Sequence, residues 1–179
     1  MGTRMYTDED IRQAVEQGAI TEEYKADSKY LIEELNRLRA TEITSFLQYK
    51  QHAFMAVSML APGLKADFES HAATELQHAD MLAERIQQLG GVPIYQPMEI
   101  ASQAAAAGVH PEQGPTLSDM VAENLMLERQ QVAAYTALVR EVGDKDPTTW
   151  RILSSILEET EKHASELADY LKRTSDTRH

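Results

Sequence analysis

The sequence contains two copies of one arrangement of residue types that bind metal ions in proteins. The first copy consists of Glu42, Tyr49, Glu75 and His78, and the second consists of Glu128, Tyr135 and His163. His78 follows Glu42 by 36 residues, and His163 follows Glu128 by 35. If each copy spans two antiparallel helices, the second helix returns its side chains to the level of the first. Carboxylates and imidazoles from four helices can then converge, as in the two-metal carboxylate sites of helical bundles.

The Glu75 and His78 pair has the spacing of two ligands on one face of a helix, because positions i and i+3 are neighbours there. A single pair of this kind arises easily by chance. This pair, however, lies on the apolar stripe that contains Ala72, Ala79 and Leu82. A charged Glu on a buried stripe is costly unless it is paired or binds a metal. The position therefore favours metal ligation.

Glu42 and Glu128 occupy similar settings in the two copies. Glu42 lies one turn from Leu38 and from Phe46, and Glu128 lies between apolar residues in the same way. A single Glu of this kind is ordinarily solvated or half of a salt bridge. Two at matching depth favour inward-facing ligands.

Tyr49 and Tyr135 each follow the corresponding Glu by seven residues, or about two helical turns. As catalytic side chains they could hydrogen-bond the metal-binding carboxylates or carry an electron during oxidation. The alternative for each is an amphipathic tyrosine at the edge of the core.

The remaining histidines give weaker indications. His71 precedes Glu75 by one turn, so it could line an access path to the site. His52, His110 and His179 have no partner that the sequence reveals, and we expect surface or packing roles for them. Glu123 is expected to face water or a neighbouring subunit.

Composition limits the kinds of partner. A chain of 179 residues with 42% hydrophobic content suits one domain with a substantial core. Its net charge of −12 disfavours nucleic acid and anionic membranes and attracts cations, although the same charge also serves plain solubility.

The chain has no cysteine, so any metal must be held by oxygen and nitrogen. No secretion signal or membrane-spanning run is evident, which predicts a cytoplasmic protein.

Hydrophobic periodicity and helix-ending residues predict an all-α chain. Thr7 should cap a short helix that Gly18 ends, within an N-terminal arm of residues 1–24. Residues 25–174 should form the bundle, and residues 175–179 a tail. The four long helices are expected at about 27–60, 65–89, 117–142 and 147–173, with a short helix near 98–107. Residues 92–116 then form a long crossover between the second and third long helices.

Several motifs resemble bacterioferritin and its ferritin-like relatives, including the Dps-like mini-ferritins. The resemblance covers roughly residues 30–173. It rests on the segments Leu35-Asn36-x-Leu38, Gln48-Tyr49, His52-Ala53, Glu75-x-x-His78-Ala79-Asp80, Ala83-Glu84-Arg85-Ile86 and Gly90-Gly91-Val92-Pro93. It implies a ferritin-like four-helix bundle with one long crossover.

The resemblance also implies a ferroxidase centre that binds two iron ions per subunit. Glu42 and Glu128 would be terminal ligands, Glu75 would bridge the two ions, and His78 and His163 would each bind one. Fe(II) would be oxidised by dioxygen or peroxide and stored, although such ligands also suit Mn(II) and Zn(II). Two alternatives stay open: a di-metal oxidase or peroxidase without a storage shell, and a non-catalytic metal-binding bundle with a degraded site.

Three positions depart from the family pattern. Leu76 stands where the family has its haem-ligating Met, so haem is not expected there. Only 16 residues follow His163, too few for a fifth helix, which favours a homo-oligomeric shell of twelve subunits. Thr160 stands where a second bridging Glu is expected. We predict that Glu159 supplies the missing carboxylate or leaves the second metal position weak.

Overall fold

The computed structural model describes residues 6–56, 62–109 and 116–176, and all its regular structure is helical. Six helices follow one another along the chain: α1 Asp8–Gln17, α2 Ser28–Met55, α3 Pro62–Gln88, α4 Pro97–Ala106, α5 Leu117–Val142 and α6 Pro147–Asp176. The prediction of an all-α fold is confirmed. None of the described helices combines the length and apolar character needed to cross a membrane.

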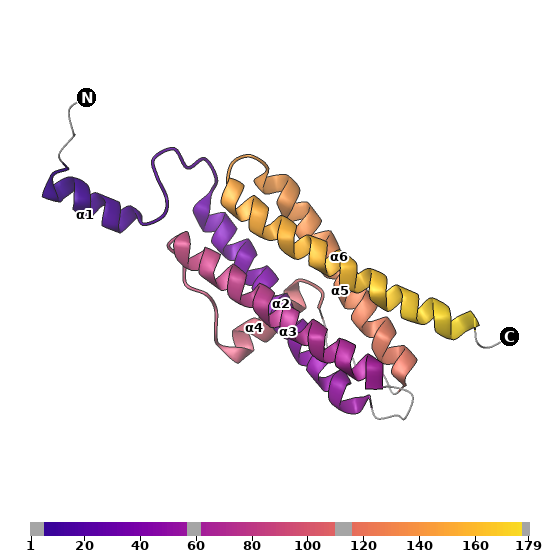
Figure 1. Ribbon diagram of the computed structural model, residues 1–179. Helices are drawn as coiled ribbons and strands as arrows, with labels where there is room; N and C mark the ends of the chain where they lie inside the picture. Colours follow the sequence, from indigo (N-terminus) through magenta and orange to yellow (C-terminus); the bar gives the residue numbers. More distant parts are fainter. Residues whose placement is uncertain (1–5, 57–61, 110–115, 177–179) are drawn as a thin grey trace.

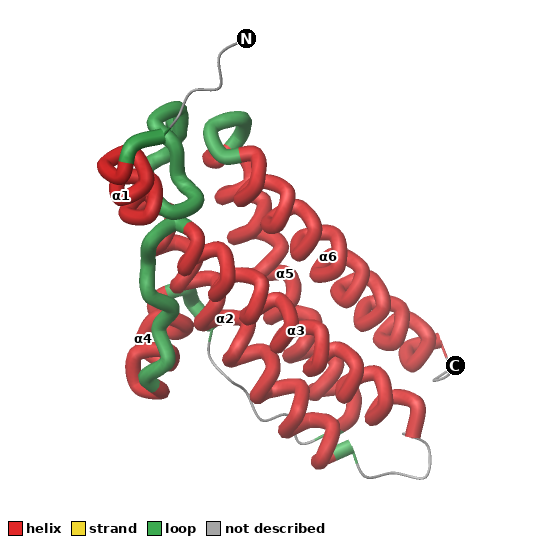
Figure 2. The backbone as a smooth tube through the Cα atoms, turned by 60° about the vertical axis from the view of Figure 1, so that its left-hand side comes forward, coloured by secondary structure: helices red, strands yellow, loops and turns green. Residues whose placement is uncertain are grey.

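The four long helices form a bundle of two hairpins. α2 packs along α3, and α5 packs along α6. The hairpins join through contacts of α2 with α5 and of α3 with α6, as Figures 1 and 2 show. The crossover carries the short helix α4, which lies against α2. α1 stands apart from the bundle in Figure 1, and none of its residues is buried.

Local sequence determines where most helices begin. The Thr7 side chain accepts from the backbone N–H of Asp10 at the start of α1, and Thr116 does the same for Asp119 at α5. Asp146 accepts from the backbone N–H of Thr149 at the start of α6. Each bond satisfies an N–H that the first helical turn leaves without a partner. The caps predicted at Thr7 and Asp146 are confirmed.

Two helix ends differ from their prediction. α2 ends at Met55 rather than near Leu60, and α3 begins at Pro62, earlier than residue 65. Proline suits the first turn of a helix, where its missing N–H costs nothing. The predicted ranges place Pro62 in the connection between two helices, whereas the structure places it at the first position of α3. Residues 57–61 lie outside the described part of the chain.

The end of α3 depends on Gly90 and Gly91. Gly90 has φ +82°, a left-handed conformation that glycine adopts without steric cost. A Cβ atom on Gly91 would lie 2.8 Å from the Ile32 side chain, so this position needs a residue without one. The two glycines therefore end the helix and let the crossover approach α2 closely.

Among the described residues, two apolar clusters lie at different levels of the bundle interior, and a third, smaller one lies beneath α4. One cluster is centred on Leu35, Leu82, Ile86, Leu153 and Ile156. The other contains Ala53, Phe68, Ala72, Val121 and Leu167. Polar side chains from all four long helices fill the level between them, so the fold places its candidate chemistry inside a largely apolar core.

Candidate metal centre

The level between the two apolar clusters, here called the polar layer, is formed by buried carboxylates and imidazoles. Its members are Glu42 of α2, Glu75 and His78 of α3, Glu128 of α5 and His163 of α6. Their exposed fractions range from 0% to 6%. The structure therefore brings together all the carboxylates and imidazoles of the two sequence copies.

One half of the polar layer consists of Glu42, Glu75 and His78. Each offers one ligand atom, and these atoms all lie within 4.8 Å of one another. Nδ1 of His78 lies 3.3 Å from Oε2 of Glu42. Neither atom has an aligned hydrogen-bond partner. These donor atoms are close enough for one cation to bind all three after a small contraction.

The other half consists of His71, Glu128 and His163, whose ligand atoms also lie within 4.8 Å of one another. Nδ1 of His163 lies 3.3 Å from Oε1 of Glu128 and 3.4 Å from Oε1 of Glu75. Glu75 therefore faces both halves of the layer. This is the place that a carboxylate bridging two metal ions would occupy.

Tyr49 and Tyr135 hydrogen-bond the outer carboxylates, each across the bundle. The Tyr135 hydroxyl on α5 donates to Glu42 on α2 at 2.6 Å, and the Tyr49 hydroxyl on α2 donates to Glu128 on α5 at 2.5 Å. Both rings are completely buried. Each tyrosine therefore holds a carboxylate of the other hairpin and leaves the second oxygen of that carboxylate, Oε2, without a hydrogen-bond partner.

Burial and crowding disturb the acid–base chemistry of the carboxylates. Burial, together with the charge of Glu42, raises the pKa of Glu75 to about 7. Burial and the charge of Glu75 likewise raise the pKa of Glu128 to about 7. Without a cation, this layer cannot hold all its carboxylates ionised at neutral pH except by keeping its histidines protonated.

Burial and the neighbouring carboxylates act in opposite directions on the pKa values of the two histidines. Burial alone would lower the pKa of His78, but the hydrogen bond and charge of Glu42 raise it to about 9. For His163, Glu128 and Glu75 overcome the same burial effect and raise the pKa to about 10. These raised pKa values favour protons at the nitrogens that a metal ion would bind, so metal binding would release protons from this layer.

Glu159 and Thr160 lie outside both groups of ligand atoms. Oε2 of Glu159 lies 2.6 Å from Nε2 of His78, on the far side of that ring from Glu42. The Glu159 side chain is 52% exposed. The Thr160 hydroxyl donates to the backbone carbonyl of Ile156, one turn earlier in α6. Glu159 therefore contacts the half of the layer that contains His78, rather than the half beside Thr160.

A buried polar network that the sequence analysis missed lies beside the layer. His52 is fully buried, and its Nδ1 donates to Asn124 at 3.2 Å, while Nε2 lies 3.5 Å from Glu123. Gln48 also donates to Asn124. The packing role expected for His52 agrees with its burial, but its polar partners lie on the opposing hairpin, which spacing along one helix does not indicate. Glu123, expected to face water or a neighbouring subunit, is partly exposed and also contacts His52. His110 and His179 lie outside the described residues.

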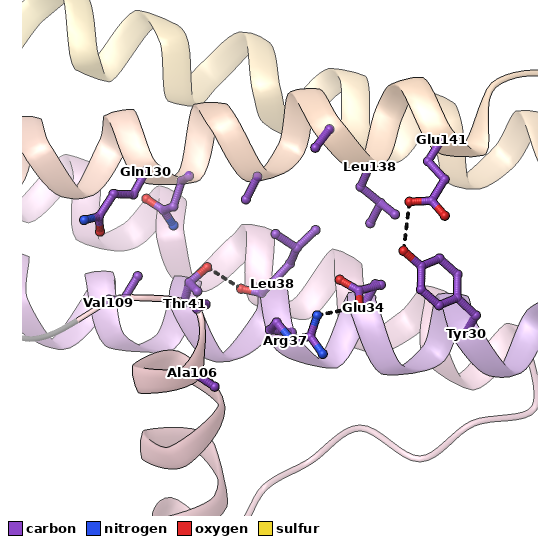
Figure 3. A pocket seen from close by; sticks show the side chains of 14 residues that line it. Tyr30, Glu34, Arg37, Leu38, Thr41, Ala106, Val109, Gln130, Leu138 and Glu141 are labelled. Atoms are coloured by element: carbon purple, nitrogen blue, oxygen red, sulfur yellow. Dashed lines mark hydrogen bonds and ion pairs between the residues drawn. The ribbon is translucent and has the colours of Figure 1, made fainter.

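Gln131 is a further missed residue: its amide donates to Glu75 at 3.4 Å. It follows Glu128 by three residues and therefore shares its helix face, which is the signal that could have identified it. Gln131 also lines a surface pocket between α2 and α5. Figure 3 shows this pocket, with Leu38 and Thr41 on one wall and Leu138 on the other.

A second surface pocket, between α3 and α6, reaches His71. Its volume is about 310 Å³, and its lining includes three acidic residues, Asp67, Glu166 and Asp169, and one basic residue, Arg173. His71 is 6% exposed and contributes to both this pocket and the polar layer. The expectation that His71 lines an access path agrees with this position, and the acidic lining would attract cations.

Comparison with known proteins gives a consistent family relationship. Residues 32–177 match the family model for ferritin, described as a ferritin-like domain. A nutrient stress-induced DNA-binding protein from Synechococcus is 31% identical over 145 residues, which cover 79% of this chain and 80% of that protein. A bacterioferritin from Desulfovibrio desulfuricans is 27% identical over 151 residues, covering 82% and 79%.

A similar fold occurs among solved structures. The bacterioferritin-related protein of Bacteroides fragilis, a dodecameric thioferritin, matches with a TM-score of 0.80 and 29% identity. The match covers 86% of this chain and 91% of that protein. The predicted ferritin-like bundle is therefore confirmed by sequence and by structure.

Proposed function

The chain belongs to the ferritin-like family, and from that membership we propose that it detoxifies and stores iron by oxidising Fe(II) within the polar layer. The observation that carries this proposal is the burial of three carboxylates, Glu42, Glu75 and Glu128, at 0% to 1% exposure. Each keeps an oxygen atom without a hydrogen-bond partner. Such a cluster is unfavourable without a cation to bind it.

The donor set fits two divalent metal ions. Carboxylate oxygens and neutral imidazole nitrogens are ligands that Fe(II), Mn(II) and Zn(II) accept. Glu42 and His78 would hold one ion, Glu128 and His163 the other, and Glu75 would contact both. Orphaned buried atoms on all five of these residues support this assignment.

Iron bound in pairs can deliver electrons to dioxygen or peroxide, each Fe(II) losing one electron and leaving as Fe(III). The protein holds the ligand side chains in position, and these side chains lose protons when metal binds. Tyr49 and Tyr135 hold the outer carboxylates in one orientation through their hydrogen bonds. His78 and His163 release protons as metal arrives, and the apolar clusters above and below keep bulk water away.

Iron would reach the layer through the acidic pocket beside His71 and would be stored inside a shell of identical subunits. The dodecameric assembly of the Bacteroides fragilis relative supports a twelve-subunit shell for this chain as well. We place the protein in the cytoplasm, where a soluble iron store would meet Fe(II).

A DNA-binding role is the second candidate, because the Synechococcus relative is named a DNA-binding protein. The net charge of −12 opposes it, since DNA binding depends on cationic side chains that neutralise phosphates. We therefore propose that this chain acts on iron without binding DNA. Two alternatives from the sequence stay open, a shell-free oxidase and a non-catalytic bundle. The experiment that tests iron oxidation also distinguishes these two from the proposed function.

That experiment combines anaerobic Fe(II) titration, oxidation kinetics after addition of dioxygen or peroxide, and particle mass on one preparation. We expect about two Fe(II) per subunit, rapid oxidation, and iron retained in a particle of many subunits. Oxidation by a small soluble species would favour the shell-free oxidase. Metal binding without any turnover would contradict the proposed function and favour the non-catalytic bundle.

A further inference from the structure

The half of the polar layer beside α6 lacks a carboxylate that its counterpart possesses. In α3, Glu75 stands three residues before His78 and faces the site. The matching position in α6 is Thr160, whose hydroxyl is directed into its own helix by the bond to Ile156. Glu159 cannot fill the gap from where it lies, because its carboxylate contacts the far nitrogen of His78.

His71 contributes a ligand atom in this half of the layer. Its Nε2 lies 3.1 Å from the Glu166 carboxylate. Its other ring nitrogen, Nδ1, is buried without a hydrogen-bond partner. A buried nitrogen left free in this way is unfavourable unless it accepts a proton or a metal ion. The ring thus has one nitrogen held by a carboxylate and one available to the site, the arrangement in which metal-binding histidines are usually oriented.

Two aromatic contacts fix the His71 ring. It stacks on the His163 ring with centroids 3.9 Å apart and planes inclined by 17°. The Tyr49 ring meets it edge-on at 5.2 Å, and Tyr49 also holds Glu128. The stacked rings lie in nearly parallel planes, whereas an imidazole nitrogen binds a metal ion in the plane of its ring. One of the two rings must therefore turn about its side-chain bonds before both nitrogens can reach one ion.

We propose that His71 is a metal ligand that takes the place of the carboxylate missing at Thr160, so that His71, Glu128 and His163 bind the second ion together with the bridging Glu75. This inference rests on the proposed di-metal centre and specifies its second half. The two metal positions then differ chemically: Glu42, Glu75 and His78 form an oxygen-rich site, and the second site is nitrogen-rich.

The difference predicts metal selectivity. Imidazole suits Zn(II) and Fe(II), whereas carboxylate-rich sites accept Mn(II) more readily. The site of His71 would contain two imidazoles, whereas the site of His78 contains one, and both would share Glu75. Zn(II) should therefore fill the site of His71 first, and Mn(II) should prefer the site of His78.

Calorimetric titration of the assembled, metal-free protein with Zn(II) under argon tests the assignment. His71→Phe keeps a stacked ring but removes the nitrogen, and we expect it to weaken one of the two Zn(II) equivalents by at least about tenfold. His52→Phe is the matched control, because His52 is equally buried but belongs to neither group. It should leave both equivalents unchanged. Adding Thr160→Glu to His71→Phe should restore the weakened equivalent.

A crystal structure of the parent protein with Zn(II) supplies a test that needs no variant. We expect an anomalous peak about 2.0–2.1 Å from a ring nitrogen of His71 and within bonding distance of Glu128 and His163. A zinc ion bound by Glu128 and His163 alone would overturn the proposal, as would two unchanged Zn(II) equivalents in a folded His71→Phe protein. If the parent binds Zn(II) at His71 but fails to oxidise Fe(II), the ferroxidase function fails and the ligand assignment stands.

Discussion

The Tyr135 hydroxyl donates a hydrogen bond to Glu42 although the two residues lie on different hairpins and Glu42 has a tyrosine on its own helix. Tyr49, that second tyrosine, bonds Glu128 in turn. The two bonds cross the bundle at the level of the polar layer. They tie α2 to α5 where the site lies, so site geometry and hairpin docking depend on the same contacts.

Tyr135→Phe should therefore reduce both stability and metal affinity. It leaves a buried carboxylate oxygen of Glu42 without its donor, which costs about 1–3 kcal/mol of the free energy of unfolding. Loss of such an outer contact also weakens metal binding by about 10–100-fold. Urea unfolding and metal titration measure the two effects. Tyr30→Phe is the control, because its hydroxyl donates to Glu141 at the surface. Equal behaviour of the two variants would contradict the structural role given to Tyr135.

Glu75→Ala should remove most metal binding, because Glu75 faces both halves of the layer. We expect the two Fe(II) equivalents per subunit to fall to one or none. Anaerobic titration and elemental analysis after desalting measure the change. Glu84→Ala, an exposed position on the same helix, should retain the parent stoichiometry. Unchanged binding in Glu75→Ala would exclude the assigned centre.

Much of the fold could be predicted because its signals are local. Apolar spacing, Thr and Asp caps and paired glycines depend on neighbours within a few residues, and these placed the long helices closely. The convergence of Glu42, Glu75 and Glu128 could be predicted too, because equal spacing in two hairpins fixes their relative depth. The ligand roles of these residues stay predictions.

Contacts that depend on the angle between helices could not be predicted. His52 was assigned to surface or packing, yet it bonds Asn124 on α5. Which half of the polar layer His71 joins depends on how α3 and α6 are rotated about their axes. The structure shows this through the stacking of His71 on the His163 ring. Arg85 likewise forms a buried pair with Asp146 at 2.9 Å across two helices. A single sequence contains no direct signal for such rotations.

The metal-free protein should lose stability as pH rises. The pKa values of Glu75 and Glu128 rise from 4.5 to about 7, and those of His78 and His163 rise from 6.5 to about 9 and 10. A group whose pKa is higher in the folded than in the unfolded protein stabilises the fold at pH values below its unfolded pKa. This stabilisation is lost as pH rises through the folded pKa, so the contributions of all four groups decline between about pH 5 and 10. His71, with its pKa lowered to about 4, acts oppositely below pH 6.5.

Thermal unfolding with a chelator at a series of pH values measures this decline. Zn(II) replaces the protons of the site, so metal-loaded protein should keep its stability up to higher pH. Glu75→Gln removes one contributing group and should flatten the slope of the metal-free curve. A metal-free protein that becomes more stable from pH 6 to 9 would contradict the assigned protonation.

Particle mass and DNA binding should separate this chain from its DNA-binding relative. We expect a closed homo-oligomer near twelve subunits by light scattering, because the similar protein of Bacteroides fragilis is dodecameric. We expect no retardation of duplex DNA at about 0.15 M salt, because a net charge of −12 per subunit repels phosphates. A monomer, or salt-resistant DNA binding, would refute the corresponding half of this prediction.

Glu159→Gln and Thr160→Glu should affect different metal positions. The sequence predicted that Glu159 serves the second position, whereas its 2.6 Å contact with Nε2 of His78 ties it to the first. Glu159→Gln removes a charge that orients His78, so it should weaken the Mn(II)-preferring equivalent by about 10-fold and leave the other intact. Thr160→Glu supplies a carboxylate three residues before His163 and should tighten the Zn(II)-preferring equivalent and raise the oxidation rate. Titration of each variant with Mn(II) and with Zn(II) distinguishes the two effects. If Glu159→Gln weakens the Zn(II)-preferring equivalent instead, Glu159 moves on metal binding and supplies the carboxylate missing at Thr160.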